Sequence, residues 1–255
     1  MYQTVFVKEQ HMVCPGVMCL VLDAPDMARA AEPGQFAMLK NWEGPDPFLM
    51  RPISINSFDR EAGTLTFLYK LVGRGTKLLA KAQPGDKVEV IAPEGRGFPV
   101  GKDFKRVAVI GRGIGIAPLR GLVEQYRAQG TEVYAYLSAK NDDFLFHKDL
   151  FTELGAVVRS TTDPNVNITD AFAKDLETLA FDAAFSCGSK RLGKDMKRLH
   201  RQYGFAAYIS LEEHMACGIG ACKGCVCKHY DEDGTETYKR VCKDGPVFDV
   251  ERVVK

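Results

Sequence analysis

The sequence lacks long apolar runs, a marked net charge and a signal-peptide pattern. No run approaches the roughly 18 apolar residues of a membrane-spanning helix, so we expect no membrane partner. The formal net charge is only +1, and no basic stripe alternates with aromatic residues, which argues against a nucleic-acid partner. The N-terminal residues Met1–Gln10 alternate polar and apolar side chains without an apolar core, so we expect a cytoplasmic protein.

Residues 1–101 form the first predicted domain, a series of short strands. Gly and Pro residues separate the strands, and only one short helical pattern, Thr76–Ala82, occurs among them. Such a series predicts a small antiparallel β-barrel. The expected strands are Thr4–Lys8, Val17–Asp23, Gln35–Lys40, Ile53–Phe58, Thr64–Leu71 and Lys87–Ala92.

Residues 102–210 form the second predicted domain, in which strands alternate with helices. Arg106–Ile110 is a short apolar strand, and apolar residues then recur at helical spacing over Ile116–Gln129, with Gly130 as the stop. This alternation predicts an α/β domain with a parallel sheet covered on both faces. Further strands are expected at Glu132–Ser138, Ala156–Ser160 and Asp182–Cys187.

Residues 211–255 form a small predicted module that holds five of the eight cysteines. Because disulfides are rare in a reducing cytosol, clustered thiols there indicate a bound metal. Cys217, Cys222 and Cys225 have the C-x4-C-x2-C spacing of plant-type [2Fe–2S] ligands, and Cys242 follows after sixteen intervening residues. We therefore predict a [2Fe–2S] cluster on these four thiolates.

A structural zinc site in a non-redox binding protein is the alternative, since four thiolates also hold zinc tetrahedrally. Zinc ligands usually occur as two C-x2-C pairs, and Cys242 has no second cysteine at that spacing. Colour separates the two, because a zinc protein is colourless whereas FAD and [2Fe–2S] together give a brown solution. Cys227 is left over, and we interpret it as a core thiol or a neighbour of the cluster. A hairpin turn is expected at Asp231–Gly234.

Two short motifs in the predicted barrel are candidates for binding a nucleotide. Arg51-Pro52-Ile53-Ser54 begins a strand, where an arginine can pair with a pyrophosphate and a serine can bond to a ring or ribitol. Gly73-Arg74-Gly75-Thr76 precedes a short helix, whose first amides attract anions. Each also has an ordinary interpretation, a strand edge for the first and a helix cap for the second.

A third motif, Gly111-Arg112-Gly113-Ile114-Gly115, lies between a buried strand and an amphipathic helix, where α/β sheets bind nucleotides. It departs from the Rossmann fingerprint, because Ile116 occupies the third glycine position. No acidic residue ends the following strand, which finishes Ser138-Ala139-Lys140. A dinucleotide is therefore a hypothesis on these residues.

Together these features resemble the ferredoxin–NADP reductase superfamily, in which an FAD barrel precedes a nucleotide domain. More specifically, the chain resembles the electron-transfer subunits of NAD-dependent, class 1B dihydroorotate dehydrogenases. The order of domains matches over essentially the whole chain. The stretches that carry the resemblance are Arg51–Ser54 with Gly75-Thr76, then Ser210–Gly218, and finally Val241–Phe248.

The resemblance implies a set of cofactor sites. FAD would be held by Arg51, Pro52, Ile53, Ser54, Leu68, Tyr69 and Lys70, with its phosphates at Gly75 and Thr76. NAD(H) would lie near Gly111, Gly113 and Cys187, and the cluster would be held by Cys217, Cys222, Cys225 and Cys242. Electrons would pass between NAD(H), FAD, the cluster and an FMN-containing catalytic subunit of pyrimidine biosynthesis, in a heterotetramer with two copies of each subunit.

Several departures from the family pattern surround the implied nicotinamide site. Arg112 replaces the middle of three glycines, Ser189 replaces a proline, and Arg96 replaces an asparagine after Glu94, where an apolar residue is commoner. Two interpretations remain open: drift that leaves NAD(H) bound, or a site altered for another nucleotide or partner. Our hypothesis is that nicotinamide binding is weakened or re-specified, and rapid bleaching of the flavin by NADH with ordinary affinity would contradict it.

We expect an oxidoreductase subunit whose substrate chemistry takes place on its partner. No Ser/His/Asp or Cys/His nucleophilic arrangement stands out, and we interpret the five histidines as solvated or structural, so no catalytic residue is predicted. An alternative keeps the relay but serves a different flavoenzyme or a ferredoxin-linked complex, with altered or lost nicotinamide binding.

Overall fold

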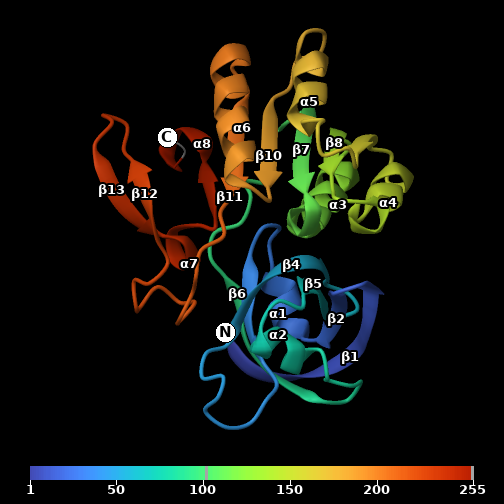
Figure 1. Cartoon of the computed structure of the whole chain (residues 1–255), viewed down its shortest axis with the longest axis vertical. Coiled ribbons are helices and arrows are strands. Elements are labelled where there is room, and N and C mark those ends of the chain that lie inside the picture. The colour runs from blue at the N-terminus through green and yellow to red at the C-terminus, as the bar shows by residue number, and fades with distance from the viewer. Residues whose placement is uncertain (101–102, 254–255) are drawn as a thin grey trace.

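The chain forms a barrel, a sheet flanked by helices, and a small cysteine-bearing part (Figure 1). The computed structural model describes residues 1–100 and 103–253, excepting the side chain of residue 190. The barrel is the lower, blue-to-teal part of Figure 1, the sheet lies above it, and the red cysteine-bearing part lies at the left. The predicted division between residues 101 and 102 falls outside the described residues.

Six antiparallel strands close into a barrel in the order β1-β2-β5-β4-β3-β6, which confirms the predicted architecture. Alternating residues such as Leu20, Leu22, Val88 and Val90 are fully buried, so every second side chain of these strands fills the barrel. The strands are β1 (Tyr2–Cys14), β2 (Val17–Asp23), β3 (Phe36–Lys40), β4 (Arg51–Asp59), β5 (Thr64–Lys70) and β6 (Lys87–Glu94).

Two short helices accompany the barrel, where the sequence predicted one. The expected helix is α2 (Arg74–Leu79), and the additional helix is α1 (Pro25–Ala30). Six residues give too short a run for a helical period to be recognised, although Pro25 marks the first turn and Met27 is fully buried.

The sheet has six strands in the order β14-β11-β10-β7-β8-β9. Five of them are parallel, as predicted, and the edge strand β14 runs antiparallel to β11. β14 comes from the cysteine-bearing part, so this part is joined to the sheet by strand pairing. The strands are β7 (Arg106–Arg112), β8 (Glu132–Ser138), β9 (Val157–Thr161), β10 (Ala183–Cys187), β11 (Ala206–Ser210) and β14 (Val247–Asp249).

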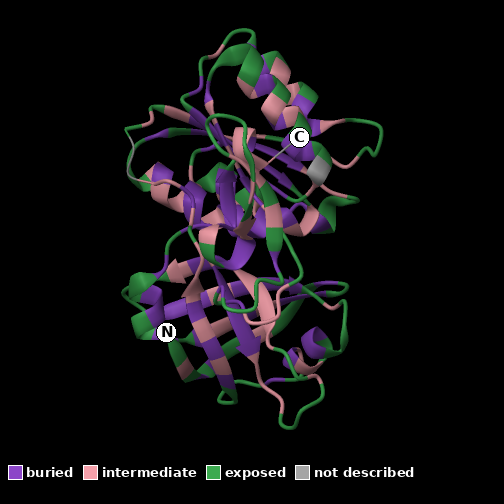
Figure 2. Cartoon of the chain, turned by 90° about the vertical axis from the view of Figure 1, so that its left-hand side faces the viewer, coloured by how far each residue is buried: buried purple, intermediate pink, exposed green. Residues whose placement is uncertain are grey.

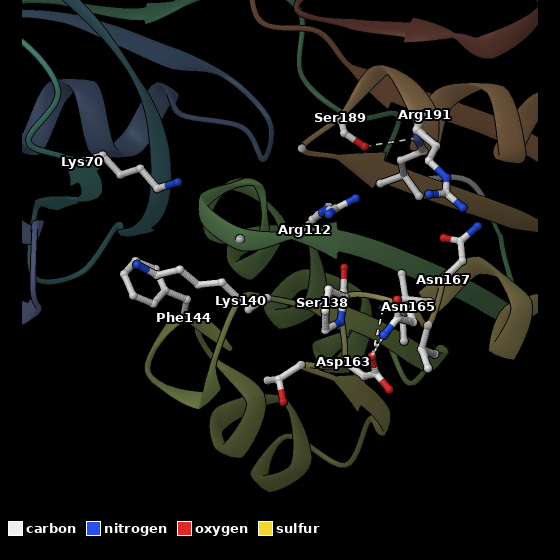
Figure 3. A pocket seen from close by; sticks show the side chains of 18 of the residues that line it. Lys70, Arg112, Ser138, Lys140, Phe144, Asp163, Asn165, Asn167, Ser189 and Arg191 are labelled. Carbon is white, nitrogen blue, oxygen red and sulfur yellow. Dashed lines mark hydrogen bonds between the residues drawn. The ribbon is translucent and has the colours of Figure 1, made fainter.

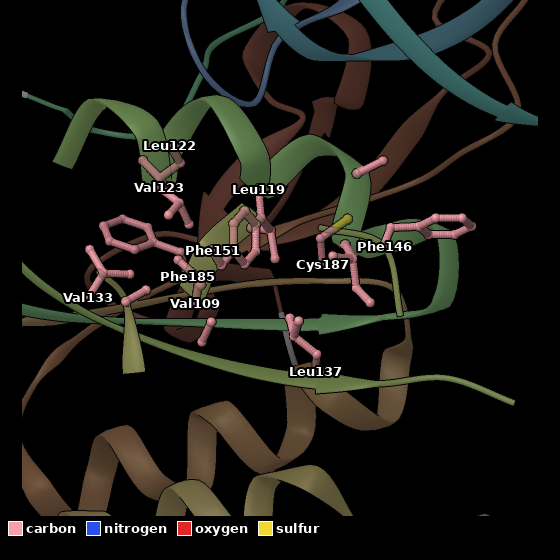
Figure 4. Close-up of a cluster of buried hydrophobic side chains, with 14 of the residues drawn as sticks. Val109, Leu119, Leu122, Val123, Val133, Leu137, Phe146, Phe151, Phe185 and Cys187 are labelled. Carbon is pink, nitrogen blue, oxygen red and sulfur yellow. The ribbon is translucent and has the colours of Figure 1, made fainter. Parts of the chain in front are cut away.

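Helices cover both faces of the sheet. Ala108 and Ile110 of β7 face α5 (Ile168–Leu176), α6 (Lys190–Tyr203) and α8 (Val250–Val253). Val107 and Val109 face the opposite cluster of apolar side chains, part of which Figure 4 shows. That face is covered by η1 (Gly113–Leu119), α3 (Arg120–Ala128) and α4 (Lys148–Glu153), and a short 3-10 turn, η2 (Asp142–Phe144), precedes α4.

The predicted helix Ile116–Gln129 begins as the 3-10 helix η1 and becomes α-helical only at α3. Pro118 lies inside η1 and has no N–H for an α-helical hydrogen bond, which accounts for the difference. The helix ends before Gly130, whose φ of 80° is left-handed, as the predicted stop requires.

The barrel and the sheet share one hydrophobic core. Val17, Leu68 and Phe98 from the barrel side belong to the same buried cluster as Val109 and Phe185 of the sheet. Figure 2 shows buried, purple segments in both parts. The barrel and the sheet therefore pack directly against each other.

The cysteine-bearing part consists of a loop, a hairpin and a short helix. The hairpin pairs β12 (Val226–Tyr230) with β13 (Glu236–Arg240), and its turn lies where the sequence predicted it. Helix α7 (Val241–Asp244) follows. Among the described residues, no helix combines the length and apolarity that crossing a membrane requires.

Candidate cofactor and metal site

A crevice of about 420 Å³ opens between the barrel and the cysteine-bearing part, and we call it the barrel crevice. Arg51–Ser54 of β4 lie half-exposed along it, whereas the next residues of the strand, Ile55, Asn56 and Ser57, are buried. A ligand bound in the crevice could therefore cover residues 51–54 without disturbing the buried part of the strand. The other walls include residues 68–70 of β5, residues 114, 117 and 118 of η1, and residues 210–215.

Arg51 is held in place by neutral groups. Its Nη1 donates to the carbonyl oxygen of Leu49 at 2.6 Å, and its guanidinium carbon lies 5.7 Å from the centroid of the Trp42 ring. A Cβ atom on Gly75 would collide with its Nε, so the guanidinium lies directly over that glycine. No ion pair engages Arg51 among the described residues, so its charge remains available to an anion.

Thr76 acts as a helix cap. Its hydroxyl accepts from the amide of Gly73 at 3.2 Å and donates to the carbonyl oxygen of the same residue at 3.0 Å. It also accepts from the amide of Val72 at 3.1 Å. These bonds favour the cap interpretation for the Thr76 side chain, although the residue lines the crevice.

The predicted residues of β5 divide between two faces, because side chains alternate along a strand. Leu68 packs in the core shared with the sheet, whereas Tyr69 packs in the barrel core. The Tyr69 hydroxyl donates to Oε1 of Gln10 at 3.3 Å, and burial raises its pKa. Lys70 is exposed, and all three residues line the barrel crevice.

The four predicted ligand cysteines lie in two neighbouring pairs. The thiols of Cys217 and Cys222 are within hydrogen-bonding reach of each other, as are those of Cys225 and Cys242. The amide of Cys222 also donates to Sγ of Cys217 at 3.4 Å, and that of Cys242 to Sγ of Cys225 at 3.4 Å.

This pairing suits a binuclear cluster better than a single ion. Among the described residues, no three His, Cys, Asp or Glu side chains converge closely enough to hold one metal ion. A [2Fe–2S] cluster takes two protein ligands on each iron, whereas structural zinc takes four on one ion. The donor set and its two-plus-two arrangement therefore fit [2Fe–2S].

The protein environment treats the four thiols differently. Burial alone would raise the pKa of Cys217, but hydrogen bonds led by the amide of Cys222 outweigh it and lower that pKa to about 7. Burial and the neighbouring Cys225 raise the pKa of Cys242 to about 12. Cys222 is exposed, whereas Cys225 and Cys242 are buried, so the cysteine loop has an outer and an inner side.

The inner side of the cysteine loop packs on the barrel. Cys225 and Cys242 belong to a buried cluster with Phe36 and Met38 of β3. Gly218 has a left-handed φ of 72°, and a Cβ atom there would collide with the Met38 thioether. Cys227 packs against the same cluster, and burial raises its pKa to about 11, which fits the interpretation as a core thiol.

Three apolar side chains, Phe36, Leu211 and Met215, belong to two neighbourhoods at once. They line the barrel crevice, and they belong to or pack against the cluster that contains Cys225 and Cys242. These three residues therefore border both the crevice and the buried cluster of the cysteine site, and we call them the shared wall. The sequence prediction missed these residues, since contacts between such distant positions leave no local pattern.

A second crevice, of about 640 Å³, lies at the carboxyl ends of β7, β8, β9 and β10, and we call it the sheet crevice (Figure 3). Gly113, one of the predicted nucleotide-binding residues, lines it. Gly111 and Cys187 are paired in register behind it, and burial raises the pKa of the Cys187 thiol to about 12. Lys70 and Val72 line both crevices, so the two are contiguous.

Comparison with known proteins gives the same assignment along the chain. The sequence model described as the iron-sulfur cluster binding domain of dihydroorotate dehydrogenase B matches residues 212–254. The dihydroorotate dehydrogenase B (NAD(+)) electron transfer subunit of Bacillus cereus (strain Q1) is 37% identical, covering 99% of this chain and 98% of that protein. The same subunit of Bacillus anthracis (strain CDC 684 / NRRL 3495) shows the same identity and coverage.

Solved structures agree on the fold. A chain of the NADH-dependent reduced ferredoxin-NADP oxidoreductase superposes with a TM-score of 0.85 at 25% identity, covering 98% of this chain and 89% of that one. Phthalate dioxygenase reductase superposes with a TM-score of 0.63 at 18% identity, covering 95% and 77%. From the near full-length identity to the curated relatives, this chain belongs to the family of electron-transfer subunits of dihydroorotate dehydrogenase B.

Proposed function

We propose that this chain relays electrons between NAD(H) and the FMN-containing catalytic subunit of a dihydroorotate dehydrogenase in pyrimidine biosynthesis. FAD is expected in the barrel crevice, [2Fe–2S] on the four paired cysteines and NAD(H) in the sheet crevice. A bound flavin supplies the conversion between a two-electron hydride and single electrons, which iron can accept. The names of the curated relatives support this proposal.

The observation that carries the proposal is the shared wall. Phe36, Leu211 and Met215 bring the cofactor crevice and the buried cysteine pair against the same side chains. Because the two crevices meet at Lys70 and Val72, the proposed NAD(H) site adjoins the proposed FAD site. These two neighbourhoods support an electron path from nucleotide to flavin to iron.

The chain's own residues hold, orient and shield these groups. Arg51 offers a guanidinium with no protein carboxylate to neutralise it, as binding a pyrophosphate requires. The shared wall places apolar side chains between the proposed flavin and cluster sites, and Lys70 supplies a positive charge where the crevices meet. The chain contributes no catalytic residue for dihydroorotate, whose oxidation belongs to the partner.

The proposal extends to location and assembly. None of the eight cysteines forms a disulfide, as expected in the reducing cytoplasm, where we place the protein. The exposed side of the cysteine loop, which includes Cys222 and Ile219, is where an electron acceptor could approach. We propose a heterotetramer with two copies of each subunit.

The test is anaerobic co-expression with a dihydroorotate dehydrogenase catalytic subunit from the same organism, followed by analysis of the purified complex. We expect FAD and iron in the complex, a brown spectrum, and NAD-dependent oxidation of dihydroorotate that disappears when this chain is omitted. Rapid bleaching of the flavin by NADH would show that NAD(H) binding is retained. It would contradict a weakened or re-specified site. A colourless complex containing zinc would refute the proposal.

A second candidate function keeps the relay but changes the partner. The likeness to a chain of the NADH-dependent reduced ferredoxin-NADP oxidoreductase, with a TM-score of 0.85, favours a ferredoxin-linked complex. Co-purification of the tagged chain from its native cells separates the two, because the partner recovered in equal amount is either a dihydroorotate dehydrogenase or a different flavoenzyme.

A further inference from the structure

Basic side chains dominate the lining of the sheet crevice. Lys70, Arg112, Lys140 and Arg191 line it, against one described acidic residue, Asp163. Figure 3 shows Lys70 reaching toward it from the barrel, whereas Arg112, Lys140 and Arg191 belong to the sheet side. A crevice of one charge sign with low-dielectric walls concentrates ligands of the opposite sign, so its ligand is an anion.

These charges are not neutralised within the protein. Among the described residues, neither Arg112 nor Arg191 forms an ion pair, and Nζ of Lys140 lies 4.1 Å from the centroid of the Phe144 ring. Asp163 sets one negative charge against these four positive ones, and its Oδ1 accepts from the amide of Asn165 at 2.8 Å. The positive charge of the crevice therefore remains for a ligand.

Arg112 occupies the most constrained position of the four. It is the last residue of β7, with an extended backbone, and it pairs in register with Ser138 at the end of β8. On the other side Gly188, with a φ of 125°, brings its backbone so close that a Cβ atom there would lie 2.6 Å from the Arg112 carbonyl oxygen. Its backbone is fixed from two sides, while its side chain is exposed and lines the crevice.

We propose that Arg112 is a phosphate-binding residue of the sheet crevice, contacting the pyrophosphate of the dinucleotide. Nucleotides bind parallel sheets at the carboxyl ends of the strands, where Arg112 lies. A guanidinium keeps its charge at every relevant pH and can donate two parallel hydrogen bonds to a phosphate. The arginine at the position of the expected glycine thus raises the affinity of the sheet crevice for the dinucleotide instead of lowering it.

The inference rests on the proposed function, because it assumes that a nicotinamide dinucleotide is the ligand. The test measures binding of ADP-ribose, which carries the pyrophosphate but no reactive ring, to the anaerobic holoprotein by calorimetry. We expect Arg112→Gln to weaken this binding roughly 10- to 100-fold, the loss typical of a hydrogen-bonded charge. Arg112→Lys should give an intermediate affinity, since lysine keeps the charge but not the paired donors.

The matched control is Arg29→Gln, an exposed arginine on α1 outside the crevice, which should leave ADP-ribose binding unchanged. In steady-state reduction of a dye by NADH, Arg112→Gln should raise KM and leave kcat unchanged, as expected for uniform binding. Equal or tighter ADP-ribose binding by Arg112→Gln would overturn the inference and leave the proposed function standing. If the unaltered protein bound neither ADP-ribose nor NADH, both this inference and the NAD(H) step of the proposed function would be refuted. The rest of the relay would then be tested by reducing the protein with dithionite and measuring reduction of the partner.

Discussion

His147 and Asn56 form a hydrogen bond across the boundary between the sheet and the barrel. Nε2 of His147, just before α4, lies 2.6 Å from Oδ1 of Asn56 in β4. Because an amide oxygen can only accept, the proton is on Nε2. His147 has a left-handed φ of 62°, and its ring centroid lies 5.8 Å from that of Phe151. The bond fixes the barrel relative to the sheet.

This histidine should make stability depend on pH. Burial, with a smaller contribution from Arg120, lowers the pKa of His147 to about 3 in the folded protein. An unfolded histidine titrates near pH 6.5, so between about pH 6.5 and 3 the unfolded state binds the extra proton. The free energy of unfolding therefore falls as the pH drops through this window, by about 1.4 kcal/mol per unit from this group.

Replacing His147 by asparagine, which tolerates a left-handed backbone, should remove this dependence. Between about pH 7.5 and 5 the unaltered protein should lose about 2 kcal/mol more than the His147→Asn variant in chemical denaturation. The measurement is the difference between the two pH profiles, which cancels the contributions of other groups. Parallel profiles would show that His147 takes up a proton as readily in the folded protein as in the unfolded chain, contrary to a lowered pKa.

Gly75→Ala should weaken FAD binding, because the added Cβ would collide with the Arg51 guanidinium. If this guanidinium binds the pyrophosphate, its displacement should cost roughly 10- to 100-fold in affinity. Gly73→Ala is the matched control, since its backbone is extended and a Cβ atom there meets nothing within 4 Å. Fluorescence of released FAD after dialysis measures both. Equal retention would mean that Arg51 is not a phosphate ligand.

Cys242→Ser should abolish the cluster, whereas Cys227→Ser should retain it. Both cysteines pack in the same neighbourhood, but only Cys242 pairs its thiol with Cys225. Anaerobic preparations should contain about two iron atoms per chain for Cys227→Ser and almost none for Cys242→Ser. Loss of iron from Cys227→Ser alone would require a different ligand set.

Asp175→Asn should destabilise the sheet without affecting either cofactor. Its carboxylate accepts from the Tyr136 hydroxyl at 2.6 Å and from two guanidinium nitrogens of Arg159 at 2.6 and 2.8 Å. Because Arg159 is partly exposed, we expect a cost of about 1–3 kcal/mol in the free energy of unfolding. Asp170→Asn, an exposed change on the same helix, should stay within about 0.5 kcal/mol. Denaturation with urea compares the two.

Local patterns in the sequence predicted the barrel strands, the parallel sheet and the cysteine spacing. They did so because alternation, helical period and ligand spacing are properties of neighbouring residues. The shared wall could not be predicted, since Phe36 and Met215 share a neighbourhood only after the cysteine-bearing part docks on the barrel. Strand β14 is only three residues long and owes its existence to pairing with β11. The role of Thr76 as a cap, rather than as a ligand side chain, also required coordinates.

The cysteine-bearing part touches both larger parts of the chain. β14 extends the sheet, the amide of Arg96 donates to the carbonyl oxygen of Gly245 at 2.5 Å, and the cysteine loop packs on Met38 of the barrel. The part that carries the four cysteines therefore also joins the sheet to the barrel, whose crevices we propose as the nucleotide and flavin sites. A substitution that displaces the cysteine-bearing part should consequently disturb the sheet and the barrel together, and not the cysteine loop alone.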